Sequence, residues 1–392
     1  MKTLNFSKLR IILCMMALLA FGLFFVTRNL NDTRYITPPN LESAHLSKRI
    51  LCHRPMRTGA PQMSIEIEKN GKVILHNYGH GGSGWTLAPG SAGYVNGFLE
   101  TSKGAANLEK TTPITIIGAG VIGFFTAYDL IKKGYTNITI VAEKFENLTS
   151  HNAGGLLAPV SMDNDPKMQK IITKIGIDAY KFYQSIAKGS HEDFKDGAVI
   201  VPAYFEKRED SGLEPYVGVV MQSAKDVVLD FKNGTKRNMV AYDDGIFIDT
   251  TKMMARLSKF LKNKKVKFKN KKITSFHEIE SKFIINCSGM GSASLKNDHK
   301  MISVQGHLIM LKNQIPENLQ HMILVYYGHH TTKSGHAVKR SFYMFPKHLE
   351  GTSENDVGVI GGTFIENATV DTPNEEEFNI MIEGAKRFYG ML

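Results

Sequence analysis

The chain has 392 residues, of which 48 are Lys or Arg and 37 are Asp or Glu, so its formal net charge is +11. Hydrophobic residues make up 42% and charged residues 22%, an ordinary composition that excludes wholesale disorder. The three cysteines form no Cys-x-x-Cys pair, which argues against a disulfide scaffold or a zinc–cysteine domain. His329, His330 and His336 lie close together in the sequence, but no carboxylate or cysteine accompanies them, so we expect a solvated loop and no metal site.

The first 27 residues predict a signal anchor or a signal peptide. Basic residues precede a charge-free apolar run at 11–26, which suits either kind of segment. We favour the uncleaved anchor, because the apolar run continues past the small residues at 20–22. The basic flank predicts a membrane-anchored chain with its folded part outside the cytoplasm, or a secreted chain if the signal is cleaved. The polar residues 28–48 are predicted to be a linker.

Residues 49–392 show the alternating strand and helix patterns typical of an α/β fold. The alternating run at 65–76 surrounds Asn70-Gly71, a strong hairpin signal. The lysine-rich run at 262–272 is predicted to protect an exposed strand edge. The other predicted elements are a βαβ unit at 114–117, 121–133 and 138–142, helices at 91–100, 166–188, 250–262 and from 372, a strand at 283–289, and a substrate-binding region over roughly 190–250 and 300–364.

A dinucleotide-binding turn follows the strand at 114–117. Its residues are Gly118-Ala119-Gly120-Val121-Ile122-Gly123. The three glycines permit a tight turn, let backbone N–H groups approach a pyrophosphate, and let the next helix pack closely. Glu143 ends the following strand, where its carboxylate can accept hydrogen bonds from the ribose hydroxyls. This motif predicts a bound dinucleotide and does not by itself distinguish NAD from FAD.

A second glycine-rich run, "HNYGHGGSGWTLAPGSA", lies upstream at 76–92. It leads from a strand-like stretch into a helix start, so its backbone N–H groups and the helix dipole can face an anion. A single phosphate-binding loop does not explain both runs.

Eight segments together resemble the D-amino-acid oxidase family of flavoenzymes. The resemblance implies a Rossmann-like FAD-binding fold of the GR2 type with a mixed-sheet substrate-binding region. It also implies FAD as the cofactor. The segments are "HRPMR" (53–57), "HNYGHGGSGWT", "IIGAGVIG", "VAEKF", "TSHNAGGLLAP", "VKFKNKKITSF", "INCSG" and "FYMFP".

The order of these segments differs from the usual order in the family, where the first two come after "FYMFP". The sequence therefore resembles a family domain that is circularly permuted, with 49–100 as the displaced carboxyl-terminal part and 113–160 as the dinucleotide-binding βαβ unit. The alternative is a duplicated or fused fragment, which would leave a second glycine-rich copy after residue 364, and the sequence has none. Permutation requires both glycine-rich loops to face the same cofactor.

The resemblance assigns FAD binding to residues from several loops. The upstream run supplies Gly81, Gly82, Ser83, Gly84, Trp85 and Thr86, and the dinucleotide turn supplies residues 118–123. The other assigned residues are Glu143, Lys144, Thr149, Ser150, His151, Gly154, Gly155, Leu156, Ile273, Ser288 and Gly289.

Arg54 matches the family's arginine that binds the substrate carboxylate, a task suited to a planar guanidinium. Tyr343 matches a tyrosine whose hydroxyl adds a second hydrogen bond, and Gly82 is assigned to the catalytic set as well. The family's further tyrosine, four positions before Tyr343, is Lys339 here. A cation at this place could favour an acidic side chain or indicate a different substrate.

The resemblance implies oxidative deamination of a D-amino acid by hydride transfer to flavin N5, followed by hydrolysis to the 2-oxo acid and ammonia. The electron acceptor would be oxygen or, given the membrane segment, a quinone. The alternatives are oxidation of glycine, sarcosine or another amine, and a flavin-binding protein without catalysis. An NAD-dependent dehydrogenase would leave the upstream glycine run unexplained. No nucleic-acid motif accompanies the basic charge.

Overall fold

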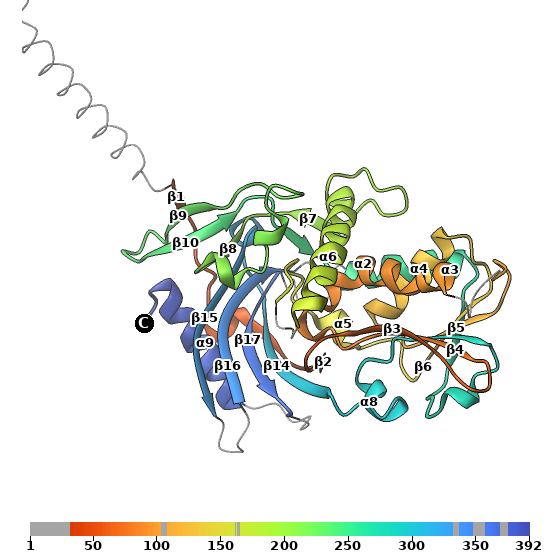
Figure 1. Cartoon of the computed structure of the whole chain (residues 1–392). Helices are drawn as coiled ribbons and strands as arrows, with labels where there is room; N and C mark the ends of the chain where they lie inside the picture. The colour runs from red at the N-terminus through yellow and green to blue at the C-terminus, as the bar shows by residue number, and fades with distance from the viewer. Residues whose placement is uncertain are drawn as a thin grey trace, which may run out of the picture.

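The computed structural model describes residues 32–102, 108–160, 162, 165–331, 337–347, 357–368 and 375–392. The expected signal segment at 1–27 lies outside them. None of the helices in these ranges combines the length and the apolar character needed to cross a membrane. Figure 1 shows two sheets side by side, with α2 and α4 covering the smaller sheet and α9 packed on the larger one.

The smaller sheet contains the predicted βαβ unit and the predicted hairpin, and both predictions are confirmed. All of its strands are parallel except β3, which is antiparallel to β4. Its central strands are continuous apolar runs, because helices and loops cover both faces. In spatial order the strands are β12 (Lys267–Asn270), β6 (Ile138–Ala142), β5 (Ile114–Ile117), β13 (Phe283–Asn286), β4 (Val73–Tyr78) and β3 (Gln62–Ile67).

The helices follow the predicted ranges closely, except at the upstream glycine run. The helix expected at 91–100 starts at Gly84 instead, because burial of Trp85 and Leu87 outweighs the low helix propensity of the glycines. The helices are α2 (Gly84–Asn96), α3 (Phe98–Thr101), α4 (Val121–Lys132), α5 (Thr149–Asn152), α6 (Pro166–Ala187), α7 (Thr250–Asn263), α8 (Ser292–Leu295) and α9 (Glu375–Tyr389).

The larger sheet is mixed, and apolar residues of α9 such as Phe378 and Met381 pack on one of its faces. In order its strands are β1 (Asp32–Tyr35), β9 (Lys225–Asp230), β10 (Lys236–Tyr242), β8 (Ala203–Phe205), β15 (Met322–Thr331), β16 (Ala337–Pro346), β17 (Gly358–Glu366), β14 (Met301–Leu311) and β2 (Leu46–Arg57). A separate pair joins β7 (Ala198–Ile200) to β11 (Ile246–Ile248).

The prediction that 28–48 is only a linker is wrong for its described part. β1 pairs in parallel with β9, and β2 already begins at Leu46. Ile36 and Leu41 are buried in the core of the larger sheet, and this burial explains why the segment is ordered.

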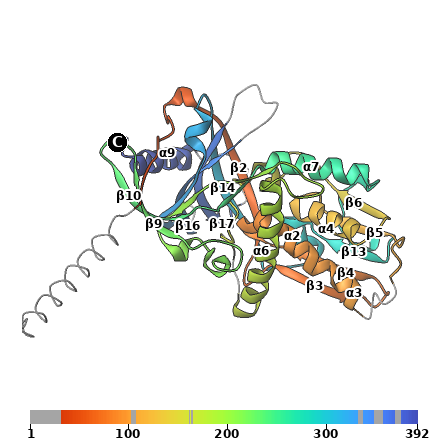
Figure 2. The same cartoon turned by 90° about the horizontal axis from the view of Figure 1, so that it is seen from above.

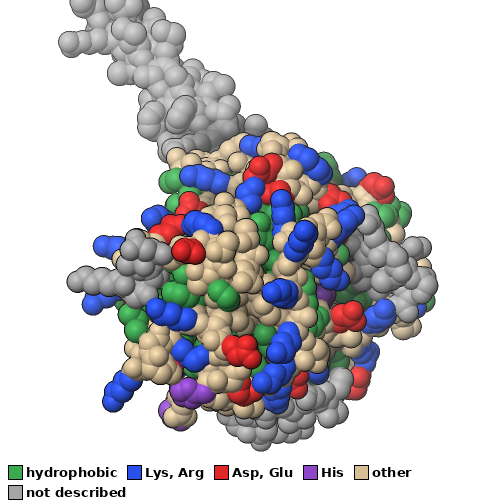
Figure 3. Space-filling view, turned by 90° about the vertical axis from the view of Figure 1, so that its right-hand side faces the viewer, with side chains coloured by type: hydrophobic (Ala, Val, Ile, Leu, Met, Phe, Trp, Pro, Cys, Tyr) green, Lys and Arg blue, Asp and Glu red, His purple; other side chains and the backbone are tan. Residues whose placement is uncertain are grey.

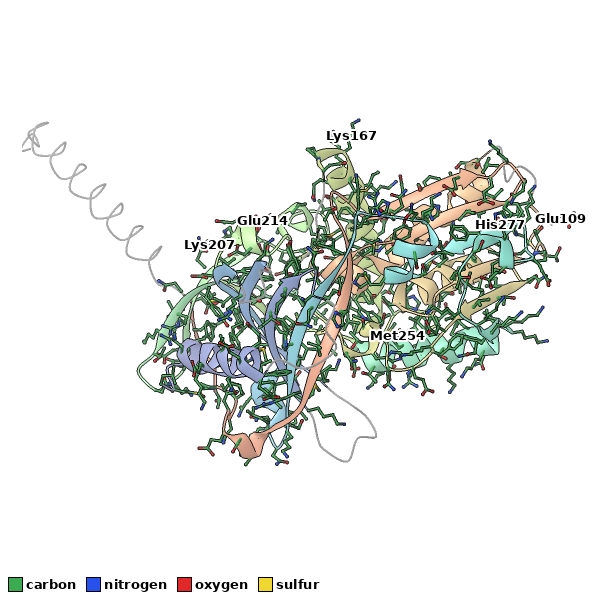
Figure 4. The ribbon with its side chains drawn as sticks, turned by 90° about the horizontal axis from the view of Figure 1, so that it is seen from below. Glu109, Lys167, Lys207, Glu214, Met254 and His277 are labelled. Carbon is green, nitrogen blue, oxygen red and sulfur yellow. The ribbon has the colours of Figure 1, made fainter. Side chains whose placement is uncertain are left out.

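β2 joins the two sheets. It pairs along its length with β14 in the larger sheet, and at its end Arg57 N donates to Gly79 O beside the smaller sheet. Figure 4 shows this strand running between the two parts, with Lys207 and Glu214 over the larger sheet and Glu109 and His277 at the opposite end.

The lysine-rich run 262–272 occupies the end of α7 and the strand β12, which is the edge of the smaller sheet. The prediction that it protects an exposed edge is confirmed. Lysine and arginine side chains are spread over the end of the molecule seen in Figure 3. Repulsion between such side chains opposes pairing of the free edge with another strand.

A proline inside α2 accounts for one contact between α2 and α6. Pro89 has no N–H, so it leaves the carbonyl of Trp85 without its helical partner. The buried Tyr183 hydroxyl donates to this oxygen at 2.9 Å. The hydrogen bond therefore satisfies a buried acceptor beside the glycine-rich run.

We predict that Tyr183→Phe lowers the free energy of unfolding by about 1–3 kcal/mol, because the Trp85 carbonyl is then buried without a partner. Tyr389→Phe is the matched control. The Tyr389 hydroxyl is buried and has no hydrogen-bond partner among the described residues, so its removal should leave stability unchanged or higher. Urea unfolding measures both variants, and equal effects would contradict this account.

Candidate active site

The two glycine-rich turns leave the same edge of the smaller sheet. β4 ends at Tyr78 and runs into the upstream turn, and β5 ends at Ile117 and runs into the dinucleotide turn. β13 lies between them, parallel to both. Because parallel strands present their carboxyl ends at one edge, turns far apart in sequence open onto a common crevice.

A cavity of about 780 Å³ lies at this edge and extends to the larger sheet. Both glycine-rich turns line it. The sequence-predicted residues in its wall are Arg54, Gly81, Gly82, Gly84, Trp85, Gly120, Val121, Ile122, Thr149, Ser150, Gly154, Gly155, Leu156, Gly289 and Tyr343.

Ser150 holds both turns in place. Its Oγ accepts a hydrogen bond from Val121 N at 3.0 Å, and its carbonyl oxygen accepts one from Trp85 Nε1 at 2.8 Å. The neighbouring Thr149 Oγ1 donates to His53 O at 2.9 Å. The 149–156 segment therefore connects the dinucleotide turn, the upstream run and β2.

Several predicted residues support the cavity from behind its wall. Gly118 has φ 110°, and a Cβ there would lie 2.3 Å from Cys287 O, so the turn requires glycine. Thr86 Oγ1 donates to Ala158 O at 2.9 Å, and Ser83 Oγ donates to Val160 O. Ala119 and Gly123 lie in the turn and in the first turn of α4.

The other predicted residues do not line the cavity. Ser288 Oγ donates to Asn286 Oδ1 at 2.7 Å, and His151 Nδ1 accepts from Leu148 N at 3.2 Å. Glu143 and Lys144 follow β6 on the surface, with Lys272 Nζ 3.8 Å from Glu143 Oε2. Ile273 is half-buried against a small apolar cluster.

Arg54 enters the cavity from the middle of β2. Its Nη1 donates to Thr363 O at 3.0 Å, and within the described residues no carboxylate forms an ion pair with it. His307 is buried nearby, and burial together with the Arg54 charge lowers its pKa to about 4. The inner part of the cavity therefore carries an uncompensated positive charge at neutral pH.

Tyr343 lies on β16 across the cavity and is buried. Burial raises its pKa to about 12, while the positive charge of Arg54 acts in the opposite direction. Its phenol is therefore protonated at neutral pH and available as a donor. The Tyr343 ring stacks on Phe345 with centroids 4.6 Å apart and planes 7° apart.

Two strand glycines, which sequence reasoning missed, make room for this pair. A Cβ at Gly306 on β14 would lie 2.4 Å from Arg54 Nη2, and one at Gly361 on β17 would lie 2.2 Å from Tyr343 Cζ. Glycine inside a strand often marks such a close approach, so "VQGHLIM" and "VIGGTF" carried the signal.

The outer part of the cavity carries charges of both signs. Lys339 is exposed, with Nζ 5.3 Å from the ring centroid of Phe364, and Asp210 and Glu366 line the wall as well. Tyr326 on β15 pairs with Ser341 on β16 and also lines the cavity. No local pattern distinguished Tyr326 or Asp210 in the sequence, because only sheet pairing and loop packing bring them here.

The cavity fits FAD. The first residues of α2 and α4 line it, so two helix N-termini present N–H groups and positive dipole ends to a pyrophosphate. From there the cavity continues past the 153–156 turn to Arg54. Groups of His, Cys, Asp or Glu able to hold a metal ion are absent from the described residues. The side chains of His329, His330 and His336 are not among those that the structure describes.

The known proteins with moderate similarity to this chain include two oxidases. The chain is 26% identical over 215 residues to a D-amino-acid oxidase of Dictyostelium discoideum, covering 53% of this chain and 59% of that protein. It is 24% identical over 214 residues to a human D-aspartate oxidase, covering 52% of this chain and 60% of that protein. The match thus spans about three fifths of each relative.

A glycine oxidase structure from Geobacillus kaustophilus has the same fold, with a TM-score of 0.51 at 13% identity over 70% of this chain and 76% of that one. The family model described as FAD dependent oxidoreductase matches residues 113–392. The chain therefore belongs to this family of FAD-dependent oxidoreductases, whose cofactor fits the cavity between its two sheets.

Proposed function

We propose that this protein oxidises D-amino acids to 2-oxo acids and ammonia, with FAD as the hydride acceptor. One observation carries the proposal: Arg54 and Tyr343 converge in the cavity that both glycine-rich turns enter. A guanidinium binds a carboxylate through two parallel hydrogen bonds, and the protonated Tyr343 can add a third.

The chain's own residues would bind and orient the substrate. Arg54 has no described acidic partner, so a carboxylate supplies the missing negative charge, and burial strengthens that pair. The apolar wall of Leu308, Leu324 and Phe345 excludes water from the α-carbon. FAD supplies the two-electron acceptor when bound, and fixed orientation supplies most of the protein's contribution.

We predict that the purified protein is yellow and that D-amino acids bleach its flavin under anaerobic conditions. The panel should include neutral D-amino acids, D-aspartate, D-glutamate, glycine and sarcosine. Preference for D-aspartate and D-glutamate would indicate that Lys339 binds the substrate side chain. Bleaching only by glycine or sarcosine would replace the proposed substrate, and bleaching by none of these compounds would favour a non-catalytic flavoprotein.

Readmitting air, or adding a quinone, to the bleached protein then identifies the electron acceptor, since only oxygen yields peroxide.

We predict that Arg54→Ala raises KM by about 100-fold or more, because removal of one partner of a buried charged pair costs several kcal/mol. FAD affinity should stay within about threefold. Arg49→Ala is the control on the same strand. Arg49 pairs with Glu375 at the surface, so its removal should leave KM unchanged. An unchanged KM in Arg54→Ala would exclude Arg54 as the carboxylate ligand.

We also propose that the chain is a circularly permuted member of its family. The family model begins at residue 113, yet β4 and α2, from the preceding part, complete the smaller sheet and line the cavity. β1 and the C-terminal end of α9 both lie at the hairpin that joins β9 to β10, since Tyr35 pairs with Asp230 and Gly390 packs on Thr235. Figures 1 and 2 both show the C-terminus beside β9 and β10. Ends that lie close together permit permutation.

We predict that a reordered chain, with residues 113–392 followed by 32–100 through a short linker, binds FAD with an affinity within about tenfold of the original. Residues 113–392 alone should not bind FAD, because they lack β4 and α2. Flavin fluorescence titration measures all three chains. A folded reordered chain without FAD binding would argue against permutation.

A further inference from the structure

A buried lysine lies directly behind the wall of the cavity. Lys347 follows the last residue of β16 and is only 3% exposed. Its Nζ donates to Ala153 O at 3.0 Å and to Thr250 Oγ1 at 2.8 Å. Lysine is seldom buried so completely, because the ammonium loses its hydration.

The two acceptors belong to different parts of the fold. Ala153 begins the 153–156 turn, whose residues Ala153, Gly154, Gly155 and Leu156 all line the cavity. Thr250 is the first residue of α7, and its Oγ1 also donates to Ala153 O at 3.2 Å. Lys347 therefore links the end of β16, the strand that carries Tyr343, to this turn and to α7.

The same strand also holds the turn through its aromatic residues. A Cβ at Gly154 would lie 2.7 Å from the Phe345 ring, so the turn packs directly on Phe345. Phe345 in turn stacks on Tyr343, the proposed donor to the substrate carboxylate. Phe345 and Lys347 thus fix the position of the 153–156 turn relative to Tyr343, which lies on the same strand.

We propose that Lys347 is a positioning residue for the flavin, which fixes the 153–156 turn in register with Tyr343 and so sets both the affinity for FAD and the rate of its reduction. Only the part of this proposal that concerns the rate of flavin reduction rests on the proposed function. FAD binding tests it without any substrate.

The surroundings of Lys347 bring its protonation into a pH range in which the protein can be studied, so varying the pH tests its role. Burial lowers its pKa to about 8, while the Asp249 carboxylate at the start of α7 favours the charged form. His151 on α5 also faces it, and burial lowers the pKa of His151 below its usual value. Lys347 therefore changes its charge between pH 7 and 9, whereas the lowered pKa of His151 keeps that side chain neutral over this interval.

Stability and FAD affinity should then change in opposite directions with pH. The unfolded chain retains the proton on this lysine up to about pH 10.4. The unfolded state thus binds more protons above pH 8, so this group makes the apoprotein more stable as pH rises from 8 to 10. The neutral amine, however, forms weaker hydrogen bonds to the turn, so FAD affinity should fall over the same interval.

The test compares Lys347→Met and Thr250→Val with the parent chain. We expect Lys347→Met to bind FAD about tenfold more weakly at pH 7, with no further weakening up to pH 9, whereas the parent chain weakens as pH rises. Thr250→Val should shift the FAD affinity in the same direction. Thr251→Val is the matched control, because its hydroxyl donates to His151 O and does not contact Lys347.

Stopped-flow reduction by the best D-amino acid gives a second measurement. We expect the limiting reduction rate of Lys347→Met to fall about tenfold, with the substrate dissociation constant within twofold of the parent. If Lys347→Met does not fold, Thr250→Val decides by the same criteria. Parent-like FAD affinity and pH dependence in the folded variant would overturn the proposal. If no amine reduces the parent flavin, the proposed function fails while the FAD titration still decides the role of Lys347.

Discussion

The candidate site depends on the parallel alignment of β4, β13 and β5. Since their carboxyl ends share one edge, the turns after Tyr78 and Ile117 must open on the same side of the sheet. The helices that follow, α2 and α4, then direct their N-termini to one crevice and pack on each other behind it. Ser150 can bond to both turns only because this edge has already brought them together.

The second constraint is the position of one arginine. β2 carries Arg54 to the cavity at the point where the strand passes between the sheets, and among the described residues no carboxylate forms an ion pair with it. Nearby His307 stays neutral, and Tyr343 stays protonated. A half-buried cation without an ion-pair partner is costly for the fold, and an anionic ligand offsets that cost. Thr363 O accepts a hydrogen bond from the guanidinium, and the absence of a side chain at Gly306 leaves room for it.

Local sequence signals were sufficient for the strands and helices around the dinucleotide turn. Continuous apolar runs, Asn70-Gly71 and the Gly118 motif each act over a few residues, so the hairpin and the βαβ unit could be predicted. The start of α2 at Gly84 could not, because tertiary burial of Trp85 outweighs the low helix propensity of the glycines. Tyr326, Asp210 and Lys347 reach the site through sheet pairing and loop packing, and no short-range pattern records such contacts. The pairing of β1 with β9 depends in the same way on residues almost two hundred positions away.

The separation between chain order and spatial order explains why the upstream glycine run could be assigned to the cofactor before its position was known. A turn binds a phosphate through its backbone N–H groups and through the helix that follows it, and both are local properties. Whether that turn serves the same ligand as another turn depends on strand neighbours, and strand neighbours do not depend on which strand comes first in the chain. β4 must pair with β13, and α2, the helix that follows β4, must pack on α4. Both conditions are met here, although β4 precedes β13 and α4 in the chain. The site therefore requires the edge shared by β4, β13 and β5, and this edge can form in any covalent order of the chain whose ends lie together at the surface.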